Sequence, residues 1–193
     1  MPSVEHNMKV EAAAAALASG AVVGVPTDTL YGLAADPFNQ DALAAVFEMK
    51  GRPGIKPLAI LVPDLERGQQ VAAFSQRAVD LAERHWPGAL TLVLPKLASV
   101  PVWVGHAERK TVGLRCPDHP AALELLEVTG PLAVTSANIS GQEAALDDGE
   151  ARALFGDQVA VYIEGETPGG TGSTIIDLTQ PAEWVLREGP IEP

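Results

Sequence analysis

Residues 22–36 read VVGVPTDTLYGLAAD, and this stretch carries the strongest signal in the chain. A β-branched apolar run ends at Pro26, and three residues with side-chain oxygens, Thr27, Asp28 and Thr29, follow it directly. A Tyr-Gly pair and a second apolar run come next. Strands that end in hydroxyls and a carboxylate usually deliver these groups to a cleft. We therefore expect a strand here whose polar end lies in a binding site.

The composition indicates a globular protein with an acidic surface. The chain has 193 residues, 47% of them hydrophobic, and a formal net charge of −12. This length predicts a single domain over residues 1–193. Phosphate neutralisation supplies most of the affinity of nonspecific nucleic-acid binding, so the negative charge disfavours broad contact with nucleic acid. A local basic cleft for a nucleotide remains open.

Further features bear on the location of the protein. No apolar run reaches the ~18 residues of a membrane-spanning helix, and the N-terminus lacks a basic segment followed by an apolar core. The one cysteine, Cys116, cannot form an internal disulfide, and we interpret it as a small buried hydrophobe. We therefore expect a cytoplasmic protein that does not contact a membrane.

Helical patterns alternate with apolar runs along the chain. Helices are expected over residues 8–19, from 39 or 40 to 49, from the N-cap Ser75 onward, before Gly130, and over 148–155. Strands are expected over 21–25, 58–62, 90–94, 111–115, 132–135, 159–163, 173–178 and 183–187, with the last three antiparallel to each other. This order predicts an α/β fold, a twisted sheet of mixed parallel and antiparallel strands with helices packed on it.

A basic loop follows the second predicted helix. Lys50, Arg52 and Lys56 lie within seven residues, on a segment that also contains Pro53 and Pro57. Arginine presents a planar fork that suits phosphate oxygens, and lysine adds a mobile point charge. The prolines lower the cost of ordering the loop on a ligand. The loop either holds an anion or is an ordinary solvated turn.

Other segments could complete such a site. Residues 131–141, PLAVTSANISG, are a buried-type strand followed by hydroxyls, an amide and backbone N–H groups that can cradle phosphate, or an ordinary turn. The glycine-rich residues 165–177 fit a ligand lid or a flexible hairpin equally well. Thr111 and Arg115 share a strand face, and Arg115 could bind a carboxylate or form a salt bridge at the strand end. Arg187 is another such arginine.

Several other chemistries are disfavoured. The sequence has no G-x-x-x-x-G-K-[ST] motif, which argues against a Walker-type nucleoside triphosphatase. The four histidines are scattered without metal-ligand spacing, so a protein-built zinc site is not expected. A G-x-S-x-G nucleophile motif is also missing.

Taken together, the motifs resemble those of the YrdC/TsaC family of L-threonylcarbamoyladenylate synthases. The similar blocks are PTDTLYGL at 26–33, KGRP at 50–53, WPGALT at 86–91, VGLR at 112–115, TSANISG at 135–141, GSTIID at 172–177 and LREGP at 186–190. One block alone would be weak evidence, but the blocks follow the family order over nearly the whole chain. The resemblance implies a YrdC-like mixed sheet with a central, positively charged cavity.

The resemblance also implies a reaction. L-Threonine, bicarbonate and ATP give threonylcarbamoyl-AMP and pyrophosphate, and a partner transferase passes the threonylcarbamoyl group to an adenosine beside the tRNA anticodon. Mg²⁺ is expected with ATP, held mostly by phosphate and water because Mg²⁺ seldom has an all-protein cage. The group that deprotonates the threonine amine is not evident, and Asp28 is one candidate.

By analogy with the family, Lys50 and Arg52 are the expected catalytic residues, which bind the ATP phosphates and offset charge at the α-phosphorus. The other expected ATP-binding residues are Thr111, Ser136, Asn138 and Arg187. The expected threonine-binding residues are Thr29, Arg115 and Ser173. Among these, Arg115 would pair with the carboxylate and Ser173 would help to close the site.

The sequence departs from that of the longer family members at two points. Longer family members carry a histidine where this chain has Leu61, and a second domain where this chain stops, so the sequence is similar to the short, single-domain form. A double-stranded RNA-binding module is the main alternative, although the net charge and the nine aromatic residues argue against it. A related carbamoyl-adenylate enzyme of hydrogenase maturation is the third possibility, but those proteins are much larger.

Overall fold

The strands of the computed structural model form one sheet, and the structure describes residues 4–51, 57–180, 182 and 184–192. The strands are β1 Val23–Val25, β2 Gly32–Ala35, β3 Ala59–Leu61, β4 Leu90–Pro95, β5 Thr111–Arg115, β6 Leu132–Ser136, β7 Val161–Tyr162, β8 Thr174–Asp177 and β9 Trp184–Arg187. Within this part of the chain, the nine-stranded sheet has the order β7-β1-β2-β6-β3-β5-β4-β8-β9. Three neighbouring pairs are parallel (β1/β7, β3/β5, β4/β8) and the other five are antiparallel, so the predicted mixed sheet is confirmed.

Most of the helices begin after a residue whose side chain accepts a hydrogen bond from their first turn. The helices are α1 Val4–Ala18, α2 Gln40–Met49, α3 Leu65–Gln69, α4 Gln76–His85, α5 Pro120–Thr129 and α6 Asp148–Phe155. The Ser75 hydroxyl accepts a hydrogen bond from the Ala78 N–H at the start of α4, as predicted, and Asn39 caps α2 in the same way. Gly130 follows α5 with a φ of 76°, a left-handed conformation that glycine adopts without strain. None of the helices in the described part of the chain is long and apolar enough to cross a membrane.

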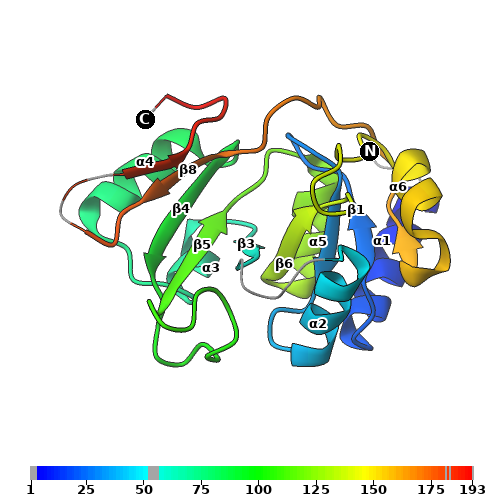
Figure 1. Ribbon diagram of the computed structural model, residues 1–193, viewed down its shortest axis with the longest axis horizontal. Helices are drawn as coiled ribbons and strands as arrows, with labels where there is room; N and C mark the ends of the chain where they lie inside the picture. Colours follow the sequence, from blue (N-terminus) through cyan, green and yellow to red (C-terminus); the bar gives the residue numbers. More distant parts are fainter. Residues whose placement is uncertain (1–3, 52–56, 181, 183, 193) are drawn as a thin grey trace.

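Helices cover both faces of one half of the sheet (Figure 1). On one face, α1 and α5 pack over β1, β2 and β6 around Leu17, Leu125 and Val134. On the other face, a larger core joins α2 and α4 to alternate residues of β3, β4 and β5, such as Ile60 and Leu92. The face that carries α1 and α5 has no helix over β4, β5 and β8 in the described part of the chain. This leaves room for a site there.

The connection between α6 and β8 corrects one sequence prediction. The segment over residues 159–163 was expected beside the last two strands, but β7 pairs in parallel with β1 at the opposite edge of the sheet. Only β8 and β9 form the expected antiparallel pair. The glycine-rich connection crosses the molecule from one edge to the other (Figure 1), so neighbours in sequence are not neighbours in the sheet. Sequence reasoning also missed β2 and the short helix α3.

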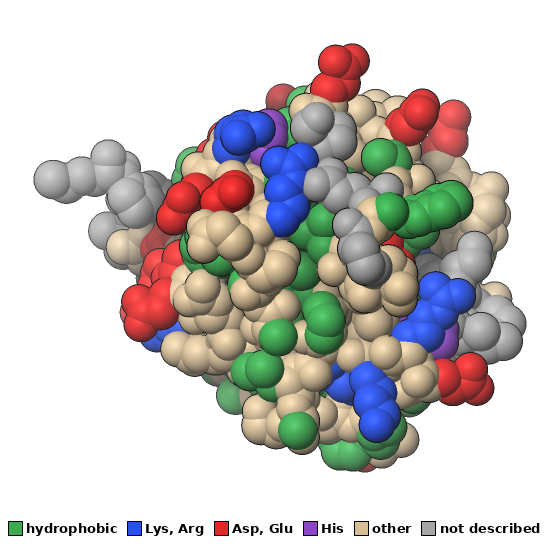
Figure 2. Space-filling view, turned by 90° about the vertical axis from the view of Figure 1, so that its left-hand side faces the viewer, with side chains coloured by type: hydrophobic (Ala, Val, Ile, Leu, Met, Phe, Trp, Pro, Cys, Tyr) green, Lys and Arg blue, Asp and Glu red, His purple; other side chains and the backbone are tan. Residues whose placement is uncertain are grey.

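The last strand forms an exposed edge. All four residues of β9 are exposed, including Trp184, Val185 and Leu186. On the end of the molecule that faces the viewer in Figure 2, acidic and basic side chains occur in small separate groups with apolar side chains between them. This end therefore does not present one extended basic surface.

Candidate functional site

A cavity of about 500 Å³ lies on the sheet face that carries α1 and α5. Its lining includes backbone and side chains from β2, β3, β4, β5, β6 and β8 and from the β1–β2 connection. The polar residues among them are Thr27, Thr29, Thr91, Arg115, Thr135, Ser136, Ser173 and Arg187. No Asp or Glu is among the described residues that line it, although the chain has 25 of them. Two arginines without lining acids favour an anionic ligand.

Arg115, at the end of β5, is fixed on several sides. Its Nε donates to the Gly88 carbonyl at 3.1 Å, its Nη1 donates to the Thr29 hydroxyl at 2.9 Å, and its Nη2 donates to the Asp28 carboxylate. The residue is only 6% exposed. Burial lowers the pKa of the guanidinium, and the Asp28 charge opposes that shift. Arginine keeps its charge under these conditions, so Arg115 is a buried cation in a preset orientation.

The β1–β2 connection brings Asp28 and Thr29 to this arginine. The Thr27 hydroxyl accepts hydrogen bonds from the backbone N–H groups of Thr29 and Leu30, at 3.2 and 3.3 Å, and donates to the Leu30 carbonyl at 2.8 Å. Threonine hydroxyls often stabilise turns in this way. The turn directs Asp28 and Thr29 at Arg115, which lies three strands away from β2 in the sheet.

A second arginine lies on the other side of the cavity. Arg187, on β9, donates from Nε to the Ser173 carbonyl at 2.8 Å and from Nη2 to the Ser173 hydroxyl at 3.1 Å. The Ser173 hydroxyl also shares a hydrogen bond of 2.7 Å with the Thr91 hydroxyl on β4. No ion pair to Arg187 occurs among the described residues. Among the described residues, no acid therefore forms an ion pair that compensates the charge of Arg187 at the cavity.

Lys50 lies beside the turn that follows β6. It is the C-cap of α2 and is 2% exposed. Its Nζ donates to the Ser136 carbonyl at 2.5 Å, to the Asn138 carbonyl at 3.0 Å and to Asn138 Oδ1 at 2.7 Å. A lysine ammonium has three protons, and the turn offers three oxygens. Lys50 thus fixes the shape of the Ser136–Asn138 turn and leaves a positive charge beneath it.

The structure brings together most of the predicted site residues. Those that line the cavity are Thr29, Arg115, Ser136, Ser173 and Arg187. Lys50 and Asn138 lie directly behind Ser136. Thr111 is not among the described lining residues, because it begins β5 at the end remote from Arg115 and its backbone pairs with His106 and Pro95. Arg52 falls outside the described residues.

Sequence reasoning placed Thr27 in the polar cluster after the first strand but gave it no role, and it did not single out Thr91 as a site residue. Thr91 lies in the WPGALT block, between Leu90 and Leu92, which are buried on the opposite face of the sheet. The alternation of a strand could have placed Thr91 on the same face as Arg115 once β4 and β5 were paired. The pairing itself required the tertiary structure.

The described residues of the cavity do not form a metal site of their own. Across the described part of the chain, no three His, Cys, Asp or Glu residues are grouped so that they could hold one. The hydroxyls and cations of the cavity suit phosphate oxygens better than they suit a bare divalent cation. Any Mg²⁺ at this site would be bound by the phosphates it arrives with.

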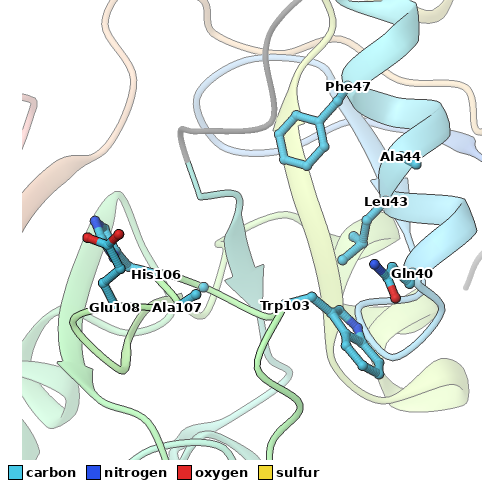
Figure 3. Close-up of a pocket in the computed structure, with 9 residues that line it drawn as sticks. Gln40, Leu43, Ala44, Phe47, Trp103, His106, Ala107 and Glu108 are labelled. Carbon is cyan, nitrogen blue, oxygen red and sulfur yellow. The ribbon is translucent and has the colours of Figure 1, made fainter.

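A second cavity, of about 470 Å³, differs in character (Figure 3). Leu43 and Phe47 project into it from α2, opposite Trp103 on the loop between β4 and β5. It adjoins a smaller hollow that reaches Ile60 and Ala133, which point to the opposite sheet face from the first cavity. It is largely apolar and contains none of the predicted site residues, so the cavity around Arg115 is the candidate active site.

The fold and this site define an α/β protein with a cation-lined ligand cavity on an open sheet face. The family model Sua5/YciO/YrdC, described as "Telomere recombination", matches residues 15–189. The chain belongs to this family, which confirms the resemblance drawn from the motifs.

Similar proteins support the assignment. The putative threonylcarbamoyl-AMP synthase of Mycobacterium tuberculosis (strain ATCC 25618 / H37Rv) is 42% identical, over 97% of this chain and 87% of the relative. The structure of Pyrococcus abyssi Sua5 complexed with L-threonine is 38% identical with a TM-score of 0.88, over 96% of this chain. The chain spans 55% of the length of that protein. E. coli YciO is 28% identical with a TM-score of 0.88, over 98% of this chain and 91% of its own.

Proposed function

We propose that the protein is an L-threonylcarbamoyladenylate synthase, a nucleotidyltransferase that forms threonylcarbamoyl-AMP and pyrophosphate from L-threonine, bicarbonate and ATP. Relatives that carry this name cover nearly the whole chain. The observation that carries the proposal is the cavity itself: a protein with a net charge of −12 lines it with two arginines and several hydroxyls but no described acid. Such a lining offsets the charges of a triphosphate and an amino-acid carboxylate.

The chemical logic starts from two negative reactants. An N-carboxylated threonine must attack the α-phosphorus of ATP through its carbamate oxygen, and pyrophosphate must leave with the bonding electrons. The cations of the cavity screen the repulsion between carbamate and triphosphate, and binding replaces the entropy of gathering three substrates. Arg115 and Thr29 would hold threonine, because they form the enclosed, preset end of the cavity.

The nucleotide would occupy the remaining walls. Ser136 lines the cavity and would contact the nucleotide there. Asn138, the other residue of this turn predicted to hold the nucleotide, shapes the turn, because its side chain accepts from Lys50 and Ser136 and donates to the Gln142 carbonyl. Arg187 lies across the cavity and would contact the phosphates or close over them, and Ser173, which stays a predicted threonine-binding residue, holds the Arg187 guanidinium through its hydroxyl. Lys50 and Arg52 stay the predicted catalytic and ATP-binding residues, and Thr111 stays a predicted ATP-binding residue. Arg52 lies outside the described residues, and Lys50 and Thr111 are not among the described residues that line the cavity. Mg²⁺ would arrive with ATP and be held by phosphate and water.

The biological setting follows from the product. A threonylcarbamoyl adenylate is a reactive mixed anhydride, so we expect a cytoplasmic partner transferase to pass its threonylcarbamoyl group to tRNA. The alternative of a double-stranded RNA-binding module gains no support from the named relatives. The net charge and the mixed face in Figure 2 also disfavour it.

One assay tests the proposal. The protein is incubated with ATP, Mg²⁺, bicarbonate and radiolabelled L-threonine, and labelled adenylate and pyrophosphate are quantified. We expect equal amounts of both, dependent on bicarbonate and lost when L-threonine is replaced by L-valine, which has no hydroxyl. Product that forms only with carbamoyl phosphate would instead indicate the hydrogenase-maturation type of reaction. Absence of product together with salt-sensitive binding of duplex RNA would refute the synthase.

A further inference from the structure

The hydrogen bonds of Arg115 within the protein use some of its N–H donors and leave others for a ligand. A guanidinium has five N–H donors, and three of them have partners among the described residues, at Gly88, Thr29 and Asp28. Arg115 lines the cavity, so the other two N–H groups are available to a ligand there. Two N–H groups in one plane match the two oxygens of a carboxylate. How well they match depends on the plane in which the guanidinium is held.

Asp28 holds the Nη2 atom of Arg115 and is not among the residues that line the cavity. Thr27 and Thr29, its neighbours on both sides, line the cavity, but Asp28 does not. Its side chain is 14% exposed, and its carboxylate is ion-paired with Arg115 Nη2. The Thr27 turn fixes the backbone on which Asp28 sits. The carboxylate thus approaches the guanidinium from the side that a cavity ligand does not occupy.

This placement disfavours Asp28 as the base that deprotonates threonine. A general base must come within hydrogen-bond reach of the proton it takes, whereas the Asp28 carboxylate is turned to Arg115 and lies outside the lining. An acid that accepted the proton would also weaken its own ion pair with a buried arginine. We infer that Asp28 is a positioning residue, which orients Arg115 so that its two remaining N–H groups bind the threonine carboxylate. The inference rests on the proposed function.

The charge balance adds a consequence for specificity. Since Asp28 compensates the charge of Arg115, this end of the cavity attracts a carboxylate through directed hydrogen bonds more than through net charge. The arrangement suits a small zwitterion and offers less to a polyanion. Binding of threonine should therefore respond to the geometry of the pair more than to its net charge.

The test compares Asp28→Ala with Asp28→Asn. The asparagine keeps an oxygen that accepts from Arg115 but cannot take a proton at neutral pH, and the alanine removes both properties. We expect Asp28→Ala to weaken L-threonine binding roughly ten- to a hundredfold, as for loss of a hydrogen bond to a charged group. Asp28→Asn should weaken it much less. The pH dependence of kcat at saturating threonine should keep its shape in both variants.

Calorimetric binding of L-threonine and of ATP supplies the readouts, and Asp41→Asn, on the exposed start of α2, is the matched control for loss of one negative charge. ATP binding that stays near wild type shows that the variants are folded. A further comparison repeats Asp28→Ala in a protein that already carries Arg115→Lys. In that background Asp28→Ala should change the affinity for L-threonine much less, because Asp28 acts through the guanidinium.

The outcomes separate the two ideas. Wild-type protein that does not bind L-threonine refutes the proposed function and the inference with it. A second outcome is that the wild-type protein binds L-threonine and both Asp28 variants keep its affinity for threonine but lose kcat to the same large extent. This outcome would show that Asp28 takes the proton, and it would overturn only the inference. An Asp28→Ala protein that binds threonine like the wild type would overturn it as well.

Discussion

The two arginines of the cavity are held in opposite ways. Arg115 is buried, ends a strand in the interior of the sheet, and donates to three different residues, one of them an acid. Arg187 is exposed, lies on the edge strand β9, and bonds only to Ser173 among the described residues. Both line the same cavity.

This difference indicates that the two arginines bind different ligands. A guanidinium fixed on several sides loses little freedom when it binds, which favours a small ligand of one shape. An exposed guanidinium with one neighbour keeps its net charge and can adjust to a larger anion whose charge shifts during reaction. We therefore assign the amino acid to the Arg115 end and the phosphates to the Arg187 end, and the following predictions challenge this assignment.

The largest effect is expected for Arg115→Ala. Loss of two charge-assisted hydrogen bonds should weaken L-threonine binding about a hundredfold or more, while ATP affinity changes little. The variant should also be less stable by about 3–5 kcal/mol, because Asp28 is left without its partner. Calorimetry and thermal melts measure both, with Arg109→Ala on the exposed loop before β5 as the control. Equal losses of ATP and threonine affinity would refute this assignment.

Arg187→Ala should have a smaller effect, and one that depends on salt. We expect the KM for ATP to rise about tenfold at ~0.05 M salt, and the difference from wild type to shrink at ~0.5 M salt because ions screen an exposed charge. The effect of Arg115→Ala should vary far less with salt, since burial limits screening there. Steady-state kinetics at several ionic strengths distinguish the two, and the same salt response in both variants would contradict the comparison.

Ser173→Ala probes the contact that holds Arg187. The substitution removes the hydroxyl that accepts from Arg187 and bonds to Thr91, but keeps the backbone carbonyl. We expect about a three- to tenfold rise in KM for ATP. Thr91→Val should give a smaller rise, and the double variant should not exceed Ser173→Ala, because both act on one network. Fully additive effects would show that Thr91 contacts substrate by a separate route.

The smallest effect concerns Cys116, which follows Arg115 directly. Burial, and then the charge of Asp64, raise the pKa of this thiol to about 12, and Arg115 only partly opposes the shift. At pH 8 roughly one molecule in ten thousand would carry a thiolate, so the folded protein should resist a disulfide reagent until the pH rises well above 9. Labelling should be faster in Arg115→Ala, because loss of the Arg115 contacts loosens the end of β5 beside Cys116. Rapid labelling of the wild type would show that the end of β5 is not rigid.

Much of the fold could be predicted from local patterns. The alternation of apolar runs and caps placed β4, β5, β6, α2 and α6 within a residue or two of their observed ends. β2 was missed because its short sequence, GLAA, lacks the β-branched residues that identify strands, and it is buried on both faces. β7 was assigned to the wrong neighbours because local sequence does not indicate which strand a segment pairs with.

In the candidate site too, local motifs predicted some features and only the tertiary structure showed the others. The family motifs brought Thr29, Arg115, Ser136, Ser173 and Arg187 to attention, and the structure gathers these five at one cavity. The motifs gave no indication that Lys50 would be buried with all its protons directed at the Ser136–Asn138 turn. They also left Asp28 open as a base, whereas its position behind Arg115 supports a different role.

By itself, the sequence determined which residue types are available and the family to which they belong. It did so because caps, alternation and short motifs are local properties of the chain. Only the tertiary structure decided which of those residues meet: Arg115 and Asp28 are 87 positions apart and pair because the β1–β2 turn crosses the sheet to β5. A charge distant in sequence becomes a partner only when strand order and burial bring both groups out of water together.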